Sequence, residues 1–237
     1  MDNTKNVLTS DGTNIFVYIE GSGEPLIFLH GNGQTSHLFK SYLPLLSKKY
    51  QCILIDARSH GESEKSKSSL TFERMACDVA EVITALKIKQ ADVIGYSDGA
   101  NVAMVLAAKH SQLVKKLILN SGNLTAEGST ALSHFLEEIY IFFGKYFTPW
   151  DNEVLSLLSE DTGLSFEDLG KITAETTVFV TQFDFIRKDH SMKICESIPH
   201  ARFFSAKFAT HFMVRFQKKR YAKLIDSFLS ENRKGIG

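Results

Sequence analysis

The chain has 237 residues, and its 27 basic and 27 acidic side chains balance to a formal net charge of zero. This length suits one sizeable α/β domain with room for a small insertion. Basic residues form only short clusters, such as the one at 218–220, so we expect no nucleic-acid partner. The N-terminal segment lacks the apolar stretch of a signal peptide, and no run approaches about 18 apolar residues. We therefore expect a cytoplasmic protein without a membrane span.

Three cysteines, Cys52, Cys77 and Cys195, lie far apart in the chain. An odd number at this spacing indicates neither a disulfide framework nor a metal-binding motif. Cys52 and Cys77 fall within apolar patterns, which predicts reduced residues in the core. The zinc-protease spacing His-Glu-x-x-His does not occur either, so we expect no metal.

Apolar segments of strand length alternate with amphipathic helices along the chain. Residues 14–20 alternate apolar and polar side chains, as a half-buried strand does. Helical spacing recurs in two stripes, from Phe72 to Leu86 and from Tyr221 to Leu229. This alternation predicts a mostly parallel, doubly wound sheet, whose ligands bind beyond the carboxyl ends of its strands. The other strands are expected at residues 25–29, 52–55, 91–95, 117–120, 177–181 and 202–205.

The sequence Gly95-Tyr96-Ser97-Asp98-Gly99 lies between the apolar run 91–95 and an alanine-rich helical stretch at 99–109. A serine on a sharp strand-to-helix turn exposes its hydroxyl, and the N-terminus of the following helix stabilises negative charge. The two glycines permit the turn because a Cβ there would clash with neighbouring backbone. An ordinary serine in a glycine-rich turn is the alternative, but this context favours a nucleophile.

A nucleophilic serine needs a base, and the base needs an orienting carboxylate. His211 follows the last strand after a short loop at 207–210, which predicts that it is the base. Asp184 follows the strand at 177–181 and is the expected acid, whereas its rival Asp189 is better placed as a helix N-cap. His30 and His60 lie in loops near the site but precede the serine. The remaining histidines are interpreted as surface residues: His37, His110, His134, His190 and His200.

Residues 125–172 break the alternation, because they show helical patterns but no convincing strand. The segment is rich in aromatic residues and follows a strand whose carboxyl end should border Ser97. It is either a helical pair that fills its own small core or a cap over the site. We predict a core formed by residues 1–124 and 173–237 with a cap at 125–172. The aromatic side chains expected to contact substrate are Phe135, Phe142, Phe143 and Trp150.

Four stretches of the chain together carry a family pattern. Residues 30–33, His-Gly-Asn-Gly, match an oxyanion-loop motif, and residues 56–63 resemble an Asp-x-Arg-Gly-His-Gly-x-Ser loop. Residues 95–99 match a nucleophile elbow, and Asp184 and His211 match the two remaining triad positions. In these motifs the chain resembles the α/β-hydrolase superfamily over essentially its whole length. The resemblance implies an α/β-hydrolase fold with a short helical lid insertion.

The chain departs from the family pattern at three positions. Ser59 stands where the family usually has glycine, and Thr210 replaces the glycine before the histidine. Residues 181–184 read Thr-Gln-Phe-Asp instead of Gly-x-x-Asp, which makes Asp184 the least secure member of the triad. Asp56 and Arg58 are expected to fix their loop and not to touch substrate.

The resemblance also implies a mechanism. His211 would take the proton of Ser97 as its oxygen attacks a carbonyl carbon, with Asp184 holding the imidazole. The backbone N–H groups of Asn32 and Asp98 would form the oxyanion hole, and water would hydrolyse the acyl-enzyme without any cofactor. The carboxylate of Asp98 either stabilises the start of the helix or turns toward the pocket, where it would favour a cationic or amino-bearing substrate.

These residues favour a serine hydrolase of small, apolar carboxylic esters, including lactones and thioesters. A carbon–carbon bond hydrolase with the same triad is the alternative, and a ligand-binding protein without turnover is a third interpretation. The resemblance implies an aspartate nucleophile in relatives that act on haloalkanes or epoxides, so Ser97 argues against those activities. The expected partner is a small-molecule substrate, and nothing in the sequence indicates the oligomeric state.

Overall fold

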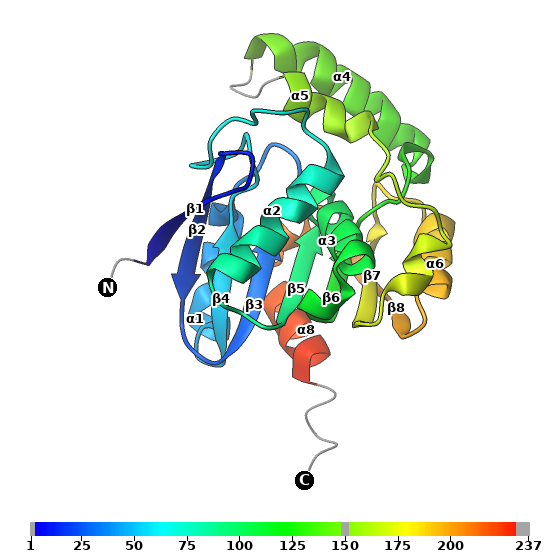
Figure 1. Ribbon diagram of the computed structural model, residues 1–237. Helices are drawn as coiled ribbons and strands as arrows, with labels where there is room; N and C mark the ends of the chain where they lie inside the picture. Colours follow the sequence, from blue (N-terminus) through cyan, green and yellow to red (C-terminus); the bar gives the residue numbers. More distant parts are fainter. Residues whose placement is uncertain (1–2, 148–151, 231–237) are drawn as a thin grey trace.

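A computed structural model describes residues 3–147 and 152–230 of the chain (Figure 1). One eight-stranded sheet runs in the order β1-β2-β4-β3-β5-β6-β7-β8. The last six strands in this order (β4, β3, β5, β6, β7 and β8) run parallel to one another, whereas β2 pairs antiparallel with both β1 and β4. The strands are β1 (Thr4–Leu8), β2 (Asn14–Glu20), β3 (Glu24–Leu29), β4 (Tyr50–Ile55), β5 (Ala91–Tyr96), β6 (Val114–Asn120), β7 (Glu175–Phe183) and β8 (Ala201–Thr210).

The predicted α/β-hydrolase sheet is confirmed, with two differences at its edges. Strand β1 was not expected, and its mostly exposed side chains give no apolar run to detect it. Residues 207–210, expected as a loop, are the last residues of β8, so His211 follows the strand directly. In the pairing of β7 with β8, Thr181 lies opposite Ala206 and Phe183 lies opposite Thr210. The register therefore shifts between these two pairs, because β8 contains extra residues there. A bulge of this kind re-aims the residues that follow it.

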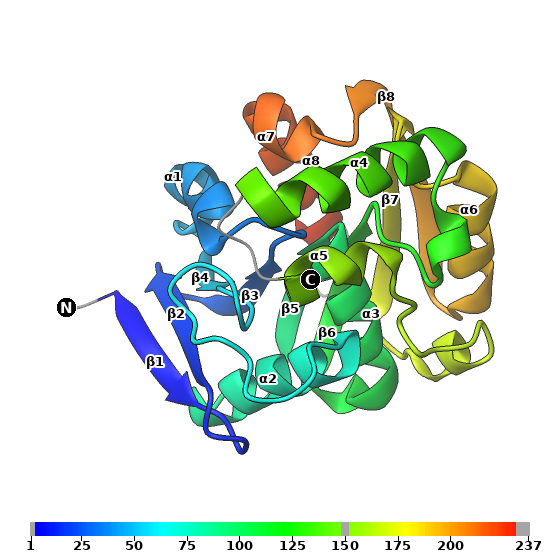
Figure 2. The same cartoon turned by 90° about the horizontal axis from the view of Figure 1, so that it is seen from above.

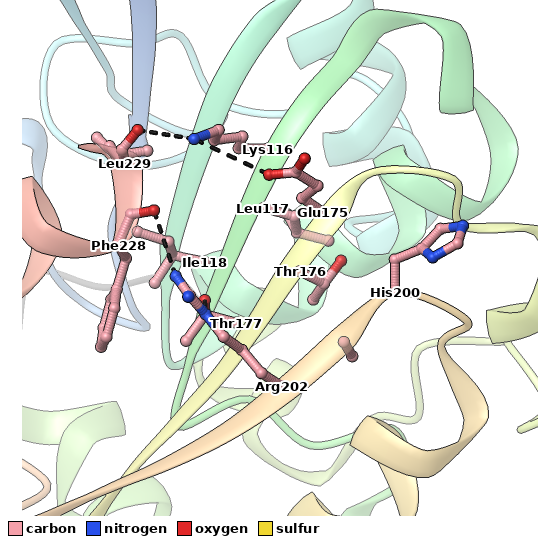
Figure 3. Close-up of a pocket in the computed structure, with 11 residues that line it drawn as sticks. Lys116, Leu117, Ile118, Glu175, Thr176, Thr177, His200, Arg202, Phe228 and Leu229 are labelled. Atoms are coloured by element: carbon pink, nitrogen blue, oxygen red, sulfur yellow. Dashed lines mark hydrogen bonds and ion pairs between the residues drawn. The ribbon is translucent and has the colours of Figure 1, made fainter. Parts of the chain in front are cut away.

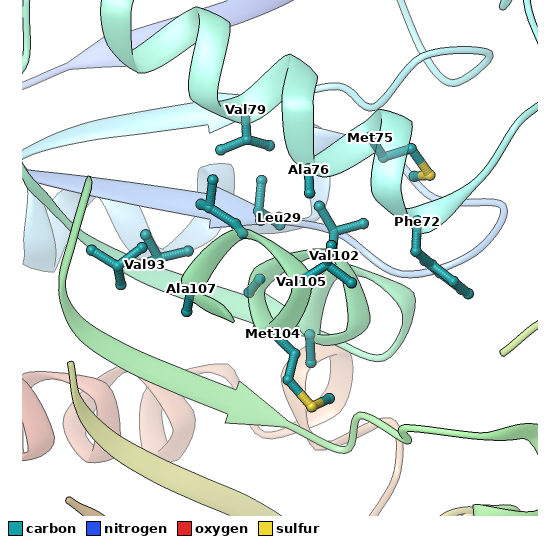
Figure 4. Close-up of a cluster of buried hydrophobic side chains, with 14 of the residues drawn as sticks. Leu29, Phe72, Met75, Ala76, Val79, Val93, Val102, Met104, Val105 and Ala107 are labelled. Atoms are coloured by element: carbon teal, nitrogen blue, oxygen red, sulfur yellow. The ribbon is translucent and has the colours of Figure 1, made fainter. Parts of the chain in front are cut away.

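Helices cover both faces of the sheet. Helices α2 (Phe72–Ala85), α3 (Asp98–Lys109) and α6 (Lys188–Ser197) contribute to one apolar cluster, part of which Figure 4 shows between α2, α3 and the strands. Helices α1 (Leu43–Leu46) and α8 (Lys218–Ser230), with the 3-10 helix η1 (Ser36–Tyr42), contribute to the cluster on the other face. Both helical stripes predicted from the sequence are therefore buried.

Helix α3 approaches the sheet more closely than a side chain would allow. A Cβ added to Gly99 would lie 2.1 Å from the carbonyl oxygen of Leu29, and one added to Gly95 would lie 2.2 Å from that of Gly99. Residues 98–108 of α3 are all buried, which explains the many alanines of this helix. The two glycines of the serine motif thus fix the distance between α3 and the carboxyl ends of β3 and β5.

The segment between β6 and β7 forms helices above the carboxyl ends of the strands (Figure 1). It contains α4 (Ala131–Phe147), α5 (Asn152–Ser156) and three 3-10 helices, η3 (Ala126–Gly128), η4 (Leu157–Ser159) and η5 (Asp168–Lys171). Leu164, Leu169 and Ile172 belong to the main apolar cluster beside α3, so the end of the predicted cap is part of the core. In the described ranges, no helix combines the length and apolar character needed to cross a bilayer.

A buried ion-pair network fixes the loop after β4. The fully buried guanidinium of Arg58 donates two hydrogen bonds of 2.6 Å to Asp78 on α2 and one of 2.8 Å to Asp11. Asp56 accepts hydrogen bonds from the backbone N–H groups of Ser36 and Glu62. These contacts agree with the expectation that both residues hold the loop.

Replacing Arg58 by methionine should destabilise the protein by about 3 kcal/mol, because buried Asp78 would lose both hydrogen bonds from Arg58 and keep only those from the partly exposed Arg74. Urea unfolding followed by circular dichroism measures the change. The matched control is Arg187→Met, which breaks an exposed ion pair with Asp189 and should leave the unfolding midpoint unchanged. Equal midpoints for wild type and Arg58→Met would contradict the assignment.

Candidate active site

Ser97 occupies a strained turn between β5 and α3. Its backbone torsions are φ 54° and ψ −124°, in a region that costs a non-glycine residue about 1–3 kcal/mol. The backbone N–H of Ser97 donates to the carbonyl of Asn120 at 2.8 Å, and its own carbonyl accepts from Ala100 in the first turn of α3 at 2.7 Å. The surrounding backbone therefore holds the serine in the geometry expected of a nucleophile elbow.

His211 and Asp184 form a buried hydrogen-bonded pair. His211 Nδ1 lies 2.8 Å from Asp184 Oδ1, and both side chains are at least nine-tenths buried. The ring of Phe185 stacks on the imidazole with centroids 4.9 Å apart, and the Tyr96 hydroxyl donates to the backbone carbonyl of His211 at 3.2 Å. In the described part of the chain, Ser97 Oγ makes no direct hydrogen bond to His211 Nε2. Catalytic hydrogen bonds are often longer in unliganded proteins than in complexes.

Asp184 is held as a carboxylate by its hydrogen-bond donors. Burial alone would raise its pKa, but hydrogen bonds from His211, Ser121 and Thr181 lower the pKa to about 2. Thr181 donates through both its backbone N–H (2.8 Å) and its hydroxyl (2.7 Å). The departure from the family's glycine at position 181 thus adds a donor. The rival acid Asp189 is exposed, pairs with Arg187 and lies in the first turn of α6, whose N-cap is Arg187.

A cavity of about 560 Å³ opens at the carboxyl ends of the strands, next to Ser97 and His211. Its size falls in the range typical of small-molecule sites. Figure 2 shows α4 running beside α7 (Met213–Phe216) on this side of the molecule, with α5 next to α4. Besides Ser97 and His211, the polar and charged side chains that line the cavity are Asn32, Gln34, Asp98, Asn123, Ser129, Ser133, Glu137 and Arg215, and the larger apolar ones are Tyr96, Leu136, Tyr140, Leu157, Leu158, Phe185, Ile186 and Phe212.

Asn32 and Asp98, the two residues expected at the oxyanion hole, both line this cavity. Asp98 is the first residue of α3, and the backbone N–H groups of a first helical turn have no acceptor within the helix. Their side chains also meet, because Asn32 Nδ2 donates to Asp98 Oδ2 at 2.9 Å and to the Val154 carbonyl at 2.6 Å. The Asp98 carboxylate therefore turns toward the cavity, which is the second of the two interpretations of this residue.

Three of the aromatic residues expected to contact substrate lie on the described part of α4, and they do not line the cavity. Phe135 and Phe142 are 60% and 63% exposed on the side of α4 that faces away from the cavity, and Phe143 is 50% exposed at the edge of the inner side. The inner side consists of Ser133, Leu136, Glu137 and Tyr140, at the i, i+3, i+4, i+7 spacing of one helix face. The prediction for the three phenylalanines is thus wrong in this structure. Trp150 lies outside the described residues.

Two neutral histidines hold the loops beside the nucleophile. His30 Nε2 accepts from the backbone N–H of Ala57 at 3.0 Å, and His60 Nε2 accepts from that of Gly33 at 3.3 Å. Their rings lie 5.0 Å apart. Burial lowers the pKa of both, that of His60 to about 4. Each Nε2 can accept a hydrogen bond from a backbone N–H only when its imidazole is neutral, so both histidines act as scaffold residues.

A third histidine, His190, is not a surface residue as expected. It is half-buried, and its Nε2 accepts from the backbone N–H of Leu124 at 3.0 Å. Burial also lowers its pKa. A Cβ at Gly128 would lie 2.5 Å from the His190 ring, so this contact holds the start of the cap against α6.

Several residues around Ser97, Asp184 and His211 were not predicted from the sequence. Phe185, Ser121 and Tyr96 support His211 and Asp184 from positions next to recognised motif residues. The signal that could have found them is their position in the sequence: Phe185 follows Asp184, Ser121 follows the end of β6, and Tyr96 precedes Ser97. Glu137 and Arg215 reach the cavity from the cap and from α7, and only the tertiary structure brings them there.

A smaller cavity of about 130 Å³ lies at the amino ends of β6 to β8, away from the triad (Figure 3). Lys116 Nζ donates to the carbonyl of Leu229 at 2.7 Å, and Arg202 donates to that of Phe228 at 3.3 Å. These carbonyls belong to the last turn of α8, where they lack helical donors. The basic side chains of this cavity therefore cap α8.

The fold and the site geometry agree with a known family. A sequence profile described as the alpha/beta hydrolase fold matches residues 24–169. The chain belongs to this family. In the ranges that the structure describes, no group of three or more His, Cys, Asp or Glu side chains is arranged to hold a metal ion.

The chain is similar to proteins whose names describe different activities. It is 31% identical over 147 residues to a soluble epoxide hydrolase of Corynebacterium sp. strain C12, covering 61% of this chain and 50% of the relative. The chain spans half or less of the length of the curated relatives it matches. A hydrolase from Pseudomonas aeruginosa has a TM-score of 0.79 at 21% identity, covering 96% of this chain and 98% of that one. The enol-lactonase of Burkholderia xenovorans LB400 also gives 0.79, at 19% identity, covering 95% and 100%. These structures show the fold.

The pH dependence of stability tests the role of His60. A group whose pKa is lower in the folded protein than in the unfolded chain stabilises the fold above its unfolded pKa and loses this effect as the pH falls. With pKa values of about 4 folded and 6.5 unfolded, His60 should contribute about 2 kcal/mol less at pH 5 than at pH 7. In His60→Gln, urea unfolding at the two pH values should show a correspondingly smaller drop. An identical drop in wild type and variant would contradict a neutral His60.

Substitutions on the two faces of α4 test the corrected cap. Tyr140→Ala, on the cavity side, should raise KM for an ester substrate about fivefold or more, because apolar contact area is lost. Phe135→Ala and Phe142→Ala remove exposed rings on the opposite face and should leave KM within about twofold of wild type. Steady-state kinetics of the three variants test this assignment. A larger increase in KM for the Phe135 variant than for the Tyr140 variant would show that the opposite face of α4 lines the cavity.

Proposed function

We propose that this protein is a serine hydrolase that cleaves small carboxylic esters through an acyl-enzyme, with Ser97, His211 and Asp184 as its triad. The observation that carries the proposal is the combination of a strained Ser97 with a buried His211–Asp184 pair at one cavity. Membership of the α/β-hydrolase family supports hydrolase activity in general. The proposal of an ester substrate and of a serine nucleophile rests on these residues.

The protonation states of the pair define the base. An ionised carboxylate only accepts hydrogen bonds, so the low pKa of Asp184 means that His211 Nδ1 carries a proton. The lone pair of Nε2 then remains for the Ser97 hydroxyl. Rotation of the Ser97 side chain brings Oγ toward Nε2, and His211 takes the proton as Oγ attacks the carbonyl carbon. The same proton passes to the departing alcohol.

The developing oxyanion would be stabilised by backbone N–H groups. Asp98 N–H lies at the start of α3, and Asn32 N–H lies in the loop held by the neutral His60. A Cβ at Gly31 would lie 2.9 Å from that of Ser97, so this loop packs directly against the nucleophile. Donors fixed in this way need no reorganisation during the reaction, and loss of one typically costs about 3 kcal/mol. Water then attacks the acyl-enzyme with His211 as base.

The cavity favours a small substrate. Its volume of about 560 Å³ holds a short ester, and Leu136, Leu157 and Leu158 offer one apolar wall. Lactones and thioesters fall within the same chemistry, and the fold neighbour named enol-lactonase is consistent with this range. The Corynebacterium relative is named an epoxide hydrolase, but a serine at position 97 argues against the aspartate-based chemistry that the resemblance implies for such relatives.

Hydrolysis of a nitrophenyl ester series of increasing acyl length tests the proposal. Wild type should show turnover that peaks at one chain length, because the cavity limits the acyl group. Ser97→Ala should reduce kcat by about 10³-fold or more, and Asp184→Asn by about 10⁴-fold, because the amide would favour the wrong imidazole tautomer. Asp189→Asn is the matched control, since Asp189 pairs with exposed Arg187, and should retain wild-type kcat.

The other interpretations have distinct outcomes. A carbon–carbon bond hydrolase would leave the esters intact and convert a diketone-like substrate to an acid and a ketone without release of an alcohol. A ligand-binding protein would neither turn over substrate nor react with an active-site serine reagent while folded. Wild type that is folded but hydrolyses no ester of the series would overturn the esterase proposal.

A further inference from the structure

Hydrogen-bond acceptors gather in the cavity on the side of the nucleophile elbow. Asp98 is only 7% exposed, yet it lines the cavity. Its Oδ2 accepts from Asn32 Nδ2, whereas no donor among the described residues reaches Oδ1. Because Oδ1 is not among the buried unpartnered atoms of the described residues, it opens onto the cavity, where a ligand can donate to it.

Two amide oxygens of the same cavity lining also lack donors. Asn32 Oδ1 and Gln34 Oε1 are both buried, and neither has a hydrogen-bond partner in the part of the chain that the structure describes. The two hydrogen bonds donated by Asn32 Nδ2, to Asp98 and Val154, fix the orientation of that amide. These two oxygens are closed off from solvent and do not contact a ligand directly, but the negative ends of their dipoles add to the negative potential on the Asp98 side of the cavity.

The cap adds a second carboxylate to this region. Glu137 projects from the inner side of α4, where Ser133 Oγ donates to its Oε1 at 2.6 Å. Burial, opposed by the hydrogen bond from Asn32 and reinforced by the charge of Glu137, raises the pKa of Asp98 to about 6. Asp98 is thus still largely ionised at neutral pH, so this side of the cavity carries negative charge.

Positive charge in the lining lies elsewhere. Arg215 belongs to α7 and is exposed, and its guanidinium lies 5.9 Å from the centroid of the Phe216 ring. Within the described residues, Arg215 makes no hydrogen bond or ion pair with Asp98 or Glu137. His211 donates to Asp184, which leaves its other nitrogen as the base. In the described lining no lysine or arginine side chain pairs with either carboxylate, although Glu137 Oε2 also lies 3.6 Å from Nδ1 of His134 on the same helix.

We propose that the cavity selects esters that carry a protonated amine, which donates hydrogen bonds to the Asp98 carboxylate and is attracted by Glu137. This inference rests on the proposed ester hydrolysis and names its substrate class. An ammonium group supplies both the donors and the positive charge that this side of the cavity lacks. The adjacent apolar wall of Leu157 and Leu158 accommodates the hydrocarbon part of such a substrate.

Two pairs of isosteric esters test the proposal at pH 7, where the amines are mainly protonated. Ethyl alaninate and ethyl 2-methylpropanoate differ by a charged amine on the acyl side. The pair of 2-(dimethylamino)ethyl acetate and 3-methylbutyl acetate differs on the alcohol side. The ratio of kcat/KM for the charged and neutral members is measured in a pH-stat for each enzyme. Intrinsic differences in ester reactivity cancel when this ratio is compared between wild type and variants.

Asp98→Asn keeps the side-chain volume but removes the charge, and it should lower the ratio about tenfold or more for at least one pair. Glu137→Gln should lower the same ratio by a smaller factor, and it provides an independent test if Asp98→Asn folds poorly. The matched control is Glu138→Gln, an exposed acid one residue further along α4, which should leave the ratio unchanged.

Each outcome separates this inference from the proposed function. A ratio that falls in Asp98→Asn and Glu137→Gln but not in Glu138→Gln supports selection of an amine. Turnover of the neutral esters with the same ratio in wild type and both variants would overturn the inference and leave ester hydrolysis intact. Absence of turnover with all four esters by folded wild type would overturn both.

Discussion

The site depends on how closely α3 approaches the carboxyl edge of the sheet. Side chains at Gly95 or Gly99 would overlap with backbone atoms at distances near 2 Å, so only glycine permits the contact. This approach forces Ser97 into a left-handed conformation and leaves the free N–H groups of the helix start beside it. Removal of either glycine would therefore disturb the nucleophile and the proposed oxyanion donors together.

The second half of the sheet places His211 and Asp184, the other two members of the proposed triad. The bulge at the end of β8 brings His211 beside Asp184. Two glutamine side chains stabilise this bulge. Gln182 accepts from the backbone N–H of Phe208, and Gln217 donates to its carbonyl. Phe208 adopts a positive φ of 54° there. Local strain at both Ser97 and Phe208 thus accompanies the convergence of three distant segments on one cavity.

Features that depend on neighbouring residues could be predicted from the sequence, and features that depend on tertiary contacts could not. The elbow at Ser97, the positions of Asp184 and His211 and most strands follow from local patterns. The orientation of α4 does not, because apolar residues such as Phe135 and Leu136 occur on both of its faces. The aromatic residues led to a wrong prediction of which face of α4 lines the cavity, because the burial of a helix face depends on the elements that pack against it. Glu137 and Arg215 both line the cavity, but they are far apart in the sequence and only the tertiary structure places them there.

The attachment of α4 has a consequence for the motions of the molecule. Within residues 131–144, only Ser133 and Gly144 are buried, and Gly144 packs against Leu155 of α5. A helix with so little buried surface detaches at a free-energy cost well below that of global unfolding. Its amide protons should therefore exchange with solvent long before those of α3, which is buried over nearly its whole length. Ligand entry through this side needs only local opening of the cap, while the sheet and its strained serine stay folded.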